Sequence, residues 1–218
     1  EKEKKITAYH ETGHAILFHE LPDVGPVHTI SIIPTGMGAA GYTMPLPEKD
    51  EMFNTKNKML ETIMVSLGGR IAEEIIFGDV TTGASQDIKQ ASAIARAMVT
   101  QYGMSEKFGL MGLETQENQY LTGRTVLNCG DATAAEIDTE VMKMLKNAYA
   151  EAKRLLSENR EAMDQIAAFL IEKETITGKE FMKIFRQVKG IPEPEEGKKE
   201  EKSRMGGEFA EDAASQPV

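Results

Sequence analysis

Apolar residues recur at the three- and four-residue spacing of an amphipathic helix along most of this 218-residue chain. A first helix is expected around His10 and His14, where Ile6, Tyr9, Gly13, Ile16 and Leu17 follow the helical pattern. The same spacing predicts further helices at about 55–77, 86–102, 132–158, 160–172 and 178–189. We therefore predict a mainly α fold.

One segment departs from this spacing. Residues 27–33 are rich in β-branched side chains, and Pro34, Thr35 and Gly36 end the run, which predicts a strand. We expect a small β element with an edge strand near the first helix, able to bind an extended peptide through main-chain hydrogen bonds. The glycines between Gly36 and Gly41 suit either close backbone approach or a flexible hairpin end.

Composition narrows the class of protein. The net charge is −10 and no basic patch occurs, which argues against nucleic acid as a partner. A single cysteine, Cys129, excludes an intrachain disulfide. No run of about 20 apolar residues is present, and residues 1–5 resemble the start of a soluble fragment cut from a longer chain. We predict one folded domain over 1–190 and a disordered acidic tail over 191–218.

The first helix contains the pattern His-Glu-x-x-His at residues 10–14. Four residues advance a helix by about 400°, so His10 and His14 lie on one face and both can bind one zinc ion. Glu11 lies roughly 100° around the helix, where it can reach a metal-bound water as a general base. Two ordinary core histidines would be the alternative. That interpretation leaves Glu11 unexplained, because a buried carboxylate needs a partner.

The third zinc ligand is less clear from the pattern. Leu17 and Glu20 replace the glycine and histidine of the metzincin motif, so that class is excluded. His19 lies about 180° around the helix from His10 and faces away, and His28 is expected at the surface. Two places then offer a distant carboxylate: the pair Glu73 and Glu74, or Asp87.

Asp87 falls in the first turn of a predicted helix, where the helix dipole favours the anion. Ser85 is the expected N-cap, and the apolar stripe of that helix is Ile88, Ala91, Ala95, Met98, Val99 and Tyr102. On this pattern, a zinc ligand and a simple helix-terminal anion are about equally favoured. For Glu73 and Glu74, a hydrogen bond to a ligand or a salt bridge is the better interpretation.

Four linked motifs resemble the peptidase domain of the FtsH family of membrane-anchored, ATP-dependent zinc metalloproteases. They lie at residues 8–15, 68–74, 82–87 and 98–105, and the resemblance extends over about 5–190. It implies a zincin-like fold with one zinc ion held by His10, His14 and Asp87, and with Glu11 as base. Thr12, Gln86 and the stretch 115–130 depart from the family pattern.

The resemblance also implies polypeptide substrates, a homo-hexamer, and an ATPase module and membrane segments outside this chain. The full-length protein would then act at the cytoplasmic face of a bacterial plasma membrane. No phosphate-binding loop occurs here, so ATP is expected only at the absent module. The expected function is a zinc endopeptidase domain. The alternatives are a zinc amidohydrolase acting on small substrates and a non-catalytic ring-assembly module with structural zinc.

Overall fold

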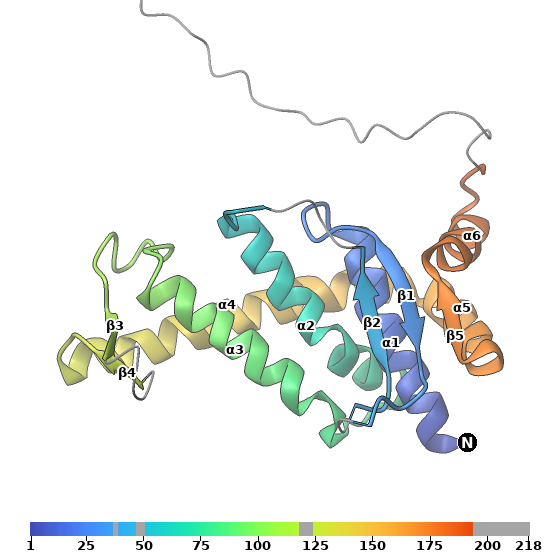
Figure 1. Ribbon diagram of the computed structural model, residues 1–218, viewed down its shortest axis with the longest axis horizontal. Helices are drawn as coiled ribbons and strands as arrows, with labels where there is room; N and C mark the ends of the chain where they lie inside the picture. Colours follow the sequence, from blue (N-terminus) through green and yellow to red (C-terminus); the bar gives the residue numbers. More distant parts are fainter. Residues whose placement is uncertain (37–38, 47–50, 118–123, 194–218) are drawn as a thin grey trace, which may run out of the picture.

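The structure is a computed structural model that describes residues 1–36, 39–46, 51–117 and 124–193. Helices dominate this part of the chain, as predicted (Figure 1). They are α1 (Lys2–Glu20), α2 (Lys56–Phe77), α3 (Ser85–Thr100), α4 (Asp131–Glu158), α5 (Arg160–Lys173) and α6 (Gly178–Lys189). Thr177 and Glu180 form the predicted capping box at the start of α6.

Helix α1 lies at the centre of the fold, and its residues from Ala8 to Leu17, except His10, are buried. It packs most extensively on α2, and the two backbones come unusually close at Gly13 and Gly68. A Cβ on Gly13 would lie only 2.5 Å from the carbonyl oxygen of Gly68. Glycine is therefore required at residue 13 for the two helices to meet at this distance. The close approach brings the backbone of α2 next to both motif histidines.

A three-stranded antiparallel sheet covers one side of α1 (Figure 1). Its order is β2 (Tyr42–Pro45), β1 (Val27–Ser31) and β5 (Thr175–Thr177). The edge strand β2 is paired on one side only within the described part of the chain, and it contacts α1. The predicted small β element with an edge strand is thus present. Strand β5 comes from far along the chain and was not predicted.

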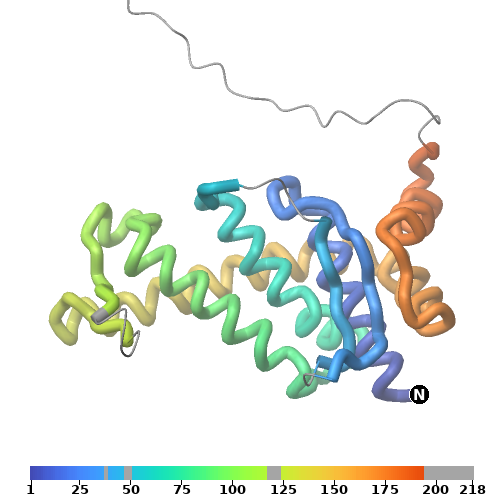
Figure 2. The backbone as a smooth tube through the Cα atoms, in the orientation of Figure 1, coloured from blue at the N-terminus to red at the C-terminus, as the bar shows by residue number. Residues whose placement is uncertain are grey.

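Figure 2 shows how the chain runs outward along α3 and returns along α4. Helices α2, α3 and α4 enclose one apolar cluster, and α1, the sheet, α5 and α6 enclose another. Met64 and Leu67 of α2 pack against both clusters. Helix α2 therefore links the site at the centre to both halves of the core. A second strand pair, β3 (Glu114–Glu117) with β4 (Arg124–Leu127), lies at the outer end.

Several local predictions were wrong. The first strand ends at Ser31 because Pro34 and Gly36 follow closely, and not at Ile33. Ser85 does not cap α3: a 3-10 turn, η1 (Thr82–Ala84), precedes it, and Ala84 holds the N-cap position. The predicted stripe of α3 is too long at both ends, since Ile88 and Tyr102 are 39% and 55% exposed.

Some predictions fall on residues outside the described ranges. These are the tail from residue 194 onward, residues 118–123 within the stretch 115–130, and residues 37–38 of the glycine-rich segment. Among the described helices, none combines the length and the apolar character that a membrane crossing requires.

Candidate metal centre

The two motif histidines lie side by side on α1, with ring centroids 4.8 Å apart. Nδ1 of His10 lies 2.7 Å from Oε1 of Glu73, and Nδ1 of His14 lies 2.7 Å from the carbonyl oxygen of Val65. Both partners accept hydrogen bonds, so each Nδ1 carries the proton and donates it. The hydrogen bonds therefore fix both rings in the orientation that leaves Nε2 for a metal.

Asp87 approaches this pair from the first turn of α3. Its Oδ2 lies 3.2 Å from Nε2 of His10 and 3.7 Å from Nε2 of His14. Ligand atoms of these three residues all lie within 4.8 Å of one another. The two imidazole rings are oriented by hydrogen bonds at Nδ1, and the carboxylate is ionised. Two imidazole nitrogens and one carboxylate oxygen are a donor set that suits zinc with a fourth coordination position open. The residues present thus fit the metal that the motif implies.

A clamp on Thr81 positions the segment that leads to Asp87. Arg70 donates from Nη2 to the carbonyl oxygen of Thr81 at 2.9 Å, and Glu73 accepts from the amide of Thr81 at 2.7 Å. The Thr81 hydroxyl in turn accepts from the amide of Gly83 at 3.1 Å, which starts η1. Two side chains of α2 therefore hold the turn before α3 through the amide and the carbonyl group of Thr81.

Glu73 and Glu74, for which the sequence favoured a hydrogen bond to a ligand or a salt bridge, make different contacts. Glu73 is 1% exposed and joins His10 to Thr81 by the hydrogen bonds given above. Glu74 lies on another face of α2, where it pairs with Lys153 at 2.8 Å and accepts from the Tyr149 hydroxyl. Neither carboxylate meets Nε2 of a motif histidine, whereas Asp87 does.

The charges in the site act on each other strongly. Burial opposes charge on His10, yet its hydrogen bonds with Asp87 and Glu73 raise the pKa of the ring to about 9. Burial lowers the pKa of His14 to about 4. Burial alone would raise the pKa of Asp87, but the hydrogen bond from His10 and the nearby ring charges lower it. A metal ion entering the site must therefore displace a proton from His10.

Glu11 lies beside the histidines and is only 6% exposed. Burial raises the pKa of its carboxyl to about 7. The Thr43 hydroxyl of β2 lies 2.8 Å from Oε2 of Glu11 and 3.0 Å from its carbonyl oxygen. This buried carboxylate thus has the partner that burial demands. Sequence reasoning missed Thr43, because it lies in a glycine-rich segment where no alternation of apolar and polar residues marks a strand.

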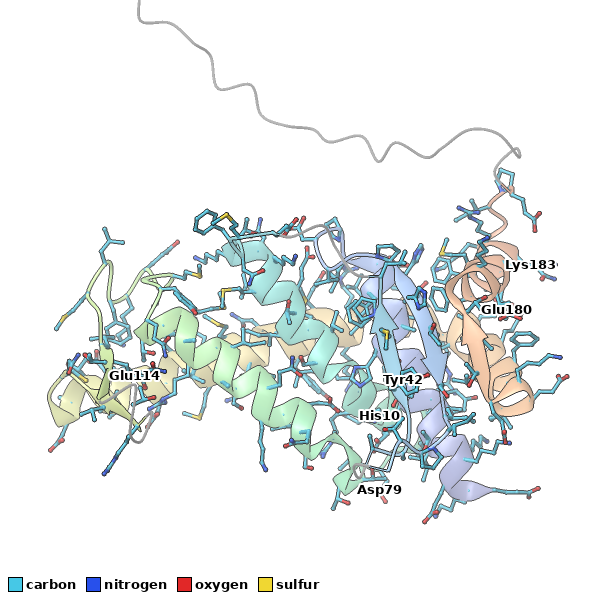
Figure 3. All side chains as sticks on the ribbon, in the orientation of Figure 1. His10, Tyr42, Asp79, Glu114, Glu180 and Lys183 are labelled. Carbon is cyan, nitrogen blue, oxygen red and sulfur yellow. The ribbon has the colours of Figure 1, made fainter. Side chains whose placement is uncertain are left out.

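The site opens into a cleft of about 1350 Å³ between α1, β2, α2 and η1. Figure 3 labels His10 and Tyr42, which come from α1 and β2 and both line this cleft. The two other histidines lie elsewhere, as predicted. His19 packs against Phe185 of α6 with ring centroids 4.3 Å apart, and His28 is exposed on β1.

A central helix with His-Glu-x-x-His, a carboxylate from a later helix and a neighbouring edge strand together define a zincin-type metallopeptidase site. The chain belongs to peptidase family M41, whose model matches residues 1–184.

Curated relatives agree with this assignment. The chain is 52% identical over 183 residues to the ATP-dependent zinc metalloprotease FtsH of Clostridium perfringens, covering 84% of this chain and 26% of the relative. It is 48% identical over 187 residues to FtsH of Lancefieldella parvula (86% and 29%). It is 44% identical over 189 residues to FtsH of Thermotoga maritima (85% and 31%). The chain thus spans less than a third of the length of these relatives.

Proposed function

We propose that this domain is a zinc-dependent endopeptidase in which His10, His14 and Asp87 hold one zinc ion and Glu11 is the general base. The convergence of two Nε2 atoms and one carboxylate oxygen within 4.8 Å is the observation that carries the proposal. The hydrogen bonds that Glu73 and Val65 accept from the two Nδ1 atoms support it, because they orient the rings as metal ligands require.

A bound zinc ion would polarise the scissile carbonyl and lower the pKa of a water molecule. The chain supplies the rest of the chemistry. Glu11 accepts the proton of the attacking water and later delivers it to the leaving amine. Burial raises the pKa of Glu11 and so makes its carboxylate a stronger base.

The shape of the cleft supports a polypeptide substrate. An extended peptide can add to the unpaired side of β2 through main-chain hydrogen bonds, with little demand on its side chains. The cleft volume of about 1350 Å³ exceeds the roughly 300–1,000 Å³ of pockets for drug-sized molecules. Both features favour an endopeptidase over an amidohydrolase for small substrates. The buried carboxylate of Glu11 beside the metal site argues against a purely structural zinc.

We infer the wider assembly from the relatives, whose names describe ATP-dependent zinc metalloproteases. This sequence contains no phosphate-binding loop, so unfolding and delivery of substrates are assigned to an ATPase module elsewhere in the full-length protein. We further propose a hexameric ring at the cytoplasmic face of the bacterial plasma membrane. Light scattering tests the ring: a mass of only 24.0 kDa at all micromolar concentrations would contradict self-assembly by this domain.

The function itself is tested with purified zinc-loaded protein. We expect cleavage of an unfolded polypeptide, and much weaker turnover of a short amide. Glu11→Gln keeps the shape of the side chain but removes the base, so this variant should retain zinc and lose hydrolysis. Faster turnover of the short amide would favour the amidohydrolase. Zinc-loaded wild-type protein that cleaves neither substrate would favour the assembly module.

A further inference from the structure

We propose that Thr43 is a positioning residue for the general base: its hydroxyl holds one carboxylate oxygen of Glu11 and leaves the other for proton transfer. This inference rests on the proposed peptidase function and goes beyond it, because the sequence motif and the family assignment give Thr43 no role.

The contact is defined on both sides. Oγ1 of Thr43 lies 2.8 Å from Oε2 of Glu11 and 3.0 Å from the carbonyl oxygen of the same residue. Thr43 is itself fixed in the sheet, where it pairs with Ile30 of β1. The Thr43 hydroxyl therefore links β2, which is paired with β1, to both the side chain and the main chain of Glu11.

The second carboxylate oxygen lies beside Gly41. A Cβ on Gly41 would be 3.0 Å from Oε1 of Glu11 and 2.6 Å from the carbonyl oxygen of Ser31. Gly41 directly precedes β2, and both Gly41 and Thr43 lie next to the Glu11 side chain, so together they form the surface against which Glu11 rests. Thr43 supplies a hydrogen bond to Oε2, and Gly41 leaves space at Oε1.

This arrangement restricts the side-chain rotation of Glu11. A glutamate has three rotatable side-chain bonds, and a base that is misplaced by about 1 Å can lose roughly a hundredfold in rate. A hydrogen bond to an ionised carboxylate is stronger than one between neutral groups, so Thr43 can select one orientation. Because Thr43 also belongs to the edge strand proposed to receive the peptide, one strand sets the position of both substrate and base.

The test compares Thr43→Val, which keeps the shape but removes the hydroxyl, with Thr43→Ser, which keeps the hydroxyl. The matched control is Thr29→Val on β1, since the Thr29 hydroxyl contacts Nδ1 of the exposed His28 at 2.7 Å and not Glu11. For each variant, kcat and KM are measured on an unfolded polypeptide, together with bound zinc and the melting temperature.

We expect Thr43→Val to lower kcat about ten- to a hundredfold, the loss that one hydrogen bond to a charged group represents. KM and zinc content should stay near wild type, and the melting temperature should fall by a few degrees at most, because the buried carboxylate of Glu11 loses one hydrogen bond while the fold keeps its shape. Thr43→Ser should recover most of kcat, and Thr29→Val should match wild type throughout. A crystal structure of Thr43→Val should show the Glu11 carboxylate turned from its wild-type orientation.

Three results would overturn the proposal: unchanged kcat in Thr43→Val, a kcat loss that Thr43→Ser does not recover, or a loss that comes with zinc release. The last two would mean that Thr43 only docks β2 onto α1. Wild-type protein that binds zinc but cleaves no polypeptide would instead remove the proposed function. Failure of the Thr43 role in an active enzyme leaves that function intact.

Discussion

A Cβ atom on residue 69 would lie 2.3 Å from Nε2 of His10, the nitrogen that faces Asp87. Because Gly69 of α2 has no side chain, it leaves space for the ring of His10, the first histidine of the motif. The ring cannot move aside freely, because Glu73 holds its other nitrogen. The backbone of α2 is thus part of the wall of the metal site.

Gly69→Ala should displace the His10 ring and weaken zinc binding, while the helix itself gains a better helix former. Gly13→Ala is the comparison, because its Cβ would meet the Gly68 carbonyl oxygen at 2.5 Å and separate α1 from α2. We expect that variant to lose thermal stability first. Titration with zinc against a chelator, combined with thermal melts, distinguishes the two effects. Wild-type zinc affinity in Gly69→Ala would contradict the steric argument.

Asp87→Asn should lose most of its zinc affinity, since the amide keeps the volume but removes the charge. Asp87→Ala should fall by well over the roughly 10–100-fold that loss of a supporting residue costs. Glu73→Gln should fall within that range, because Glu73 supports the site through hydrogen bonds from His10 and from the Thr81 amide but does not contact Nε2 of either histidine. Competition with a chelator ranks the three variants. Normal zinc binding by Asp87→Asn beside a Glu73→Gln that cannot hold metal would reverse the assignment of ligands.

Arg70→Met should weaken zinc binding by roughly tenfold or less, at the low end of the range for supporting residues. Methionine keeps the apolar stem of the side chain but cannot donate to the Thr81 carbonyl, which frees the turn before Asp87. Lys153→Met is the matched control: it also replaces a cation by methionine, but Lys153 lies on α4 and pairs with Glu74 away from the site. Equal zinc affinities for the two variants would show that the clamp on Thr81 does not act on the metal.

The pair of Glu74 and Lys153 predicts a pH-dependent contribution to folding. Hydrogen bonds from Lys153 and then from Tyr149 lower the pKa of Glu74 below 4.5 in the folded state. The unfolded state therefore binds its proton first, and the stabilisation is present above the unfolded pKa and disappears as pH falls through the folded value. Glu74→Gln should be less stable than wild type at neutral pH.

This difference in unfolding free energy should shrink once the pH falls below about 4.5. Denaturant unfolding of both proteins at several pH values measures it. Glu172→Gln on α5, where the native side chain is 73% exposed, serves as the control and should unfold like wild type. A gap between Glu74→Gln and wild type that stays constant down to pH 3 would rule out this linkage.

The sequence predicted those features that depend on spacing within one element. His10 and His14 share a helix face because four residues separate them, and the helices predicted at 55–77 and 132–158 rest on the same helical spacing. Asp87 was different: its helix could be predicted, but its approach to His10 depends on how α3 follows η1. No local pattern specifies that turn, and the expected N-cap at Ser85 was wrong for the same reason.

The strands were harder to predict because tertiary contacts form them. Strand β5 has only three residues, Thr175–Thr177, between two helices, and it exists because β1 offers an edge. Thr43 lies in a segment whose glycines hid its alternation. Its contact with Glu11 arises only when β2 packs on α1.

The pairing of β1 with β5 also determines when the three-stranded sheet can be completed during synthesis. During synthesis, Thr175–Thr177 follow Ser31, the last residue of β1, by more than 140 residues. At translation rates of about 5–20 residues per second, synthesis of that segment takes roughly seven to thirty seconds. Until Thr175–Thr177 have been synthesised, β1, which pairs with the strand of Thr43, lacks one of its two neighbouring strands. A nascent chain therefore carries its complete His-Glu-x-x-His motif long before the three-stranded sheet beside that motif can be complete.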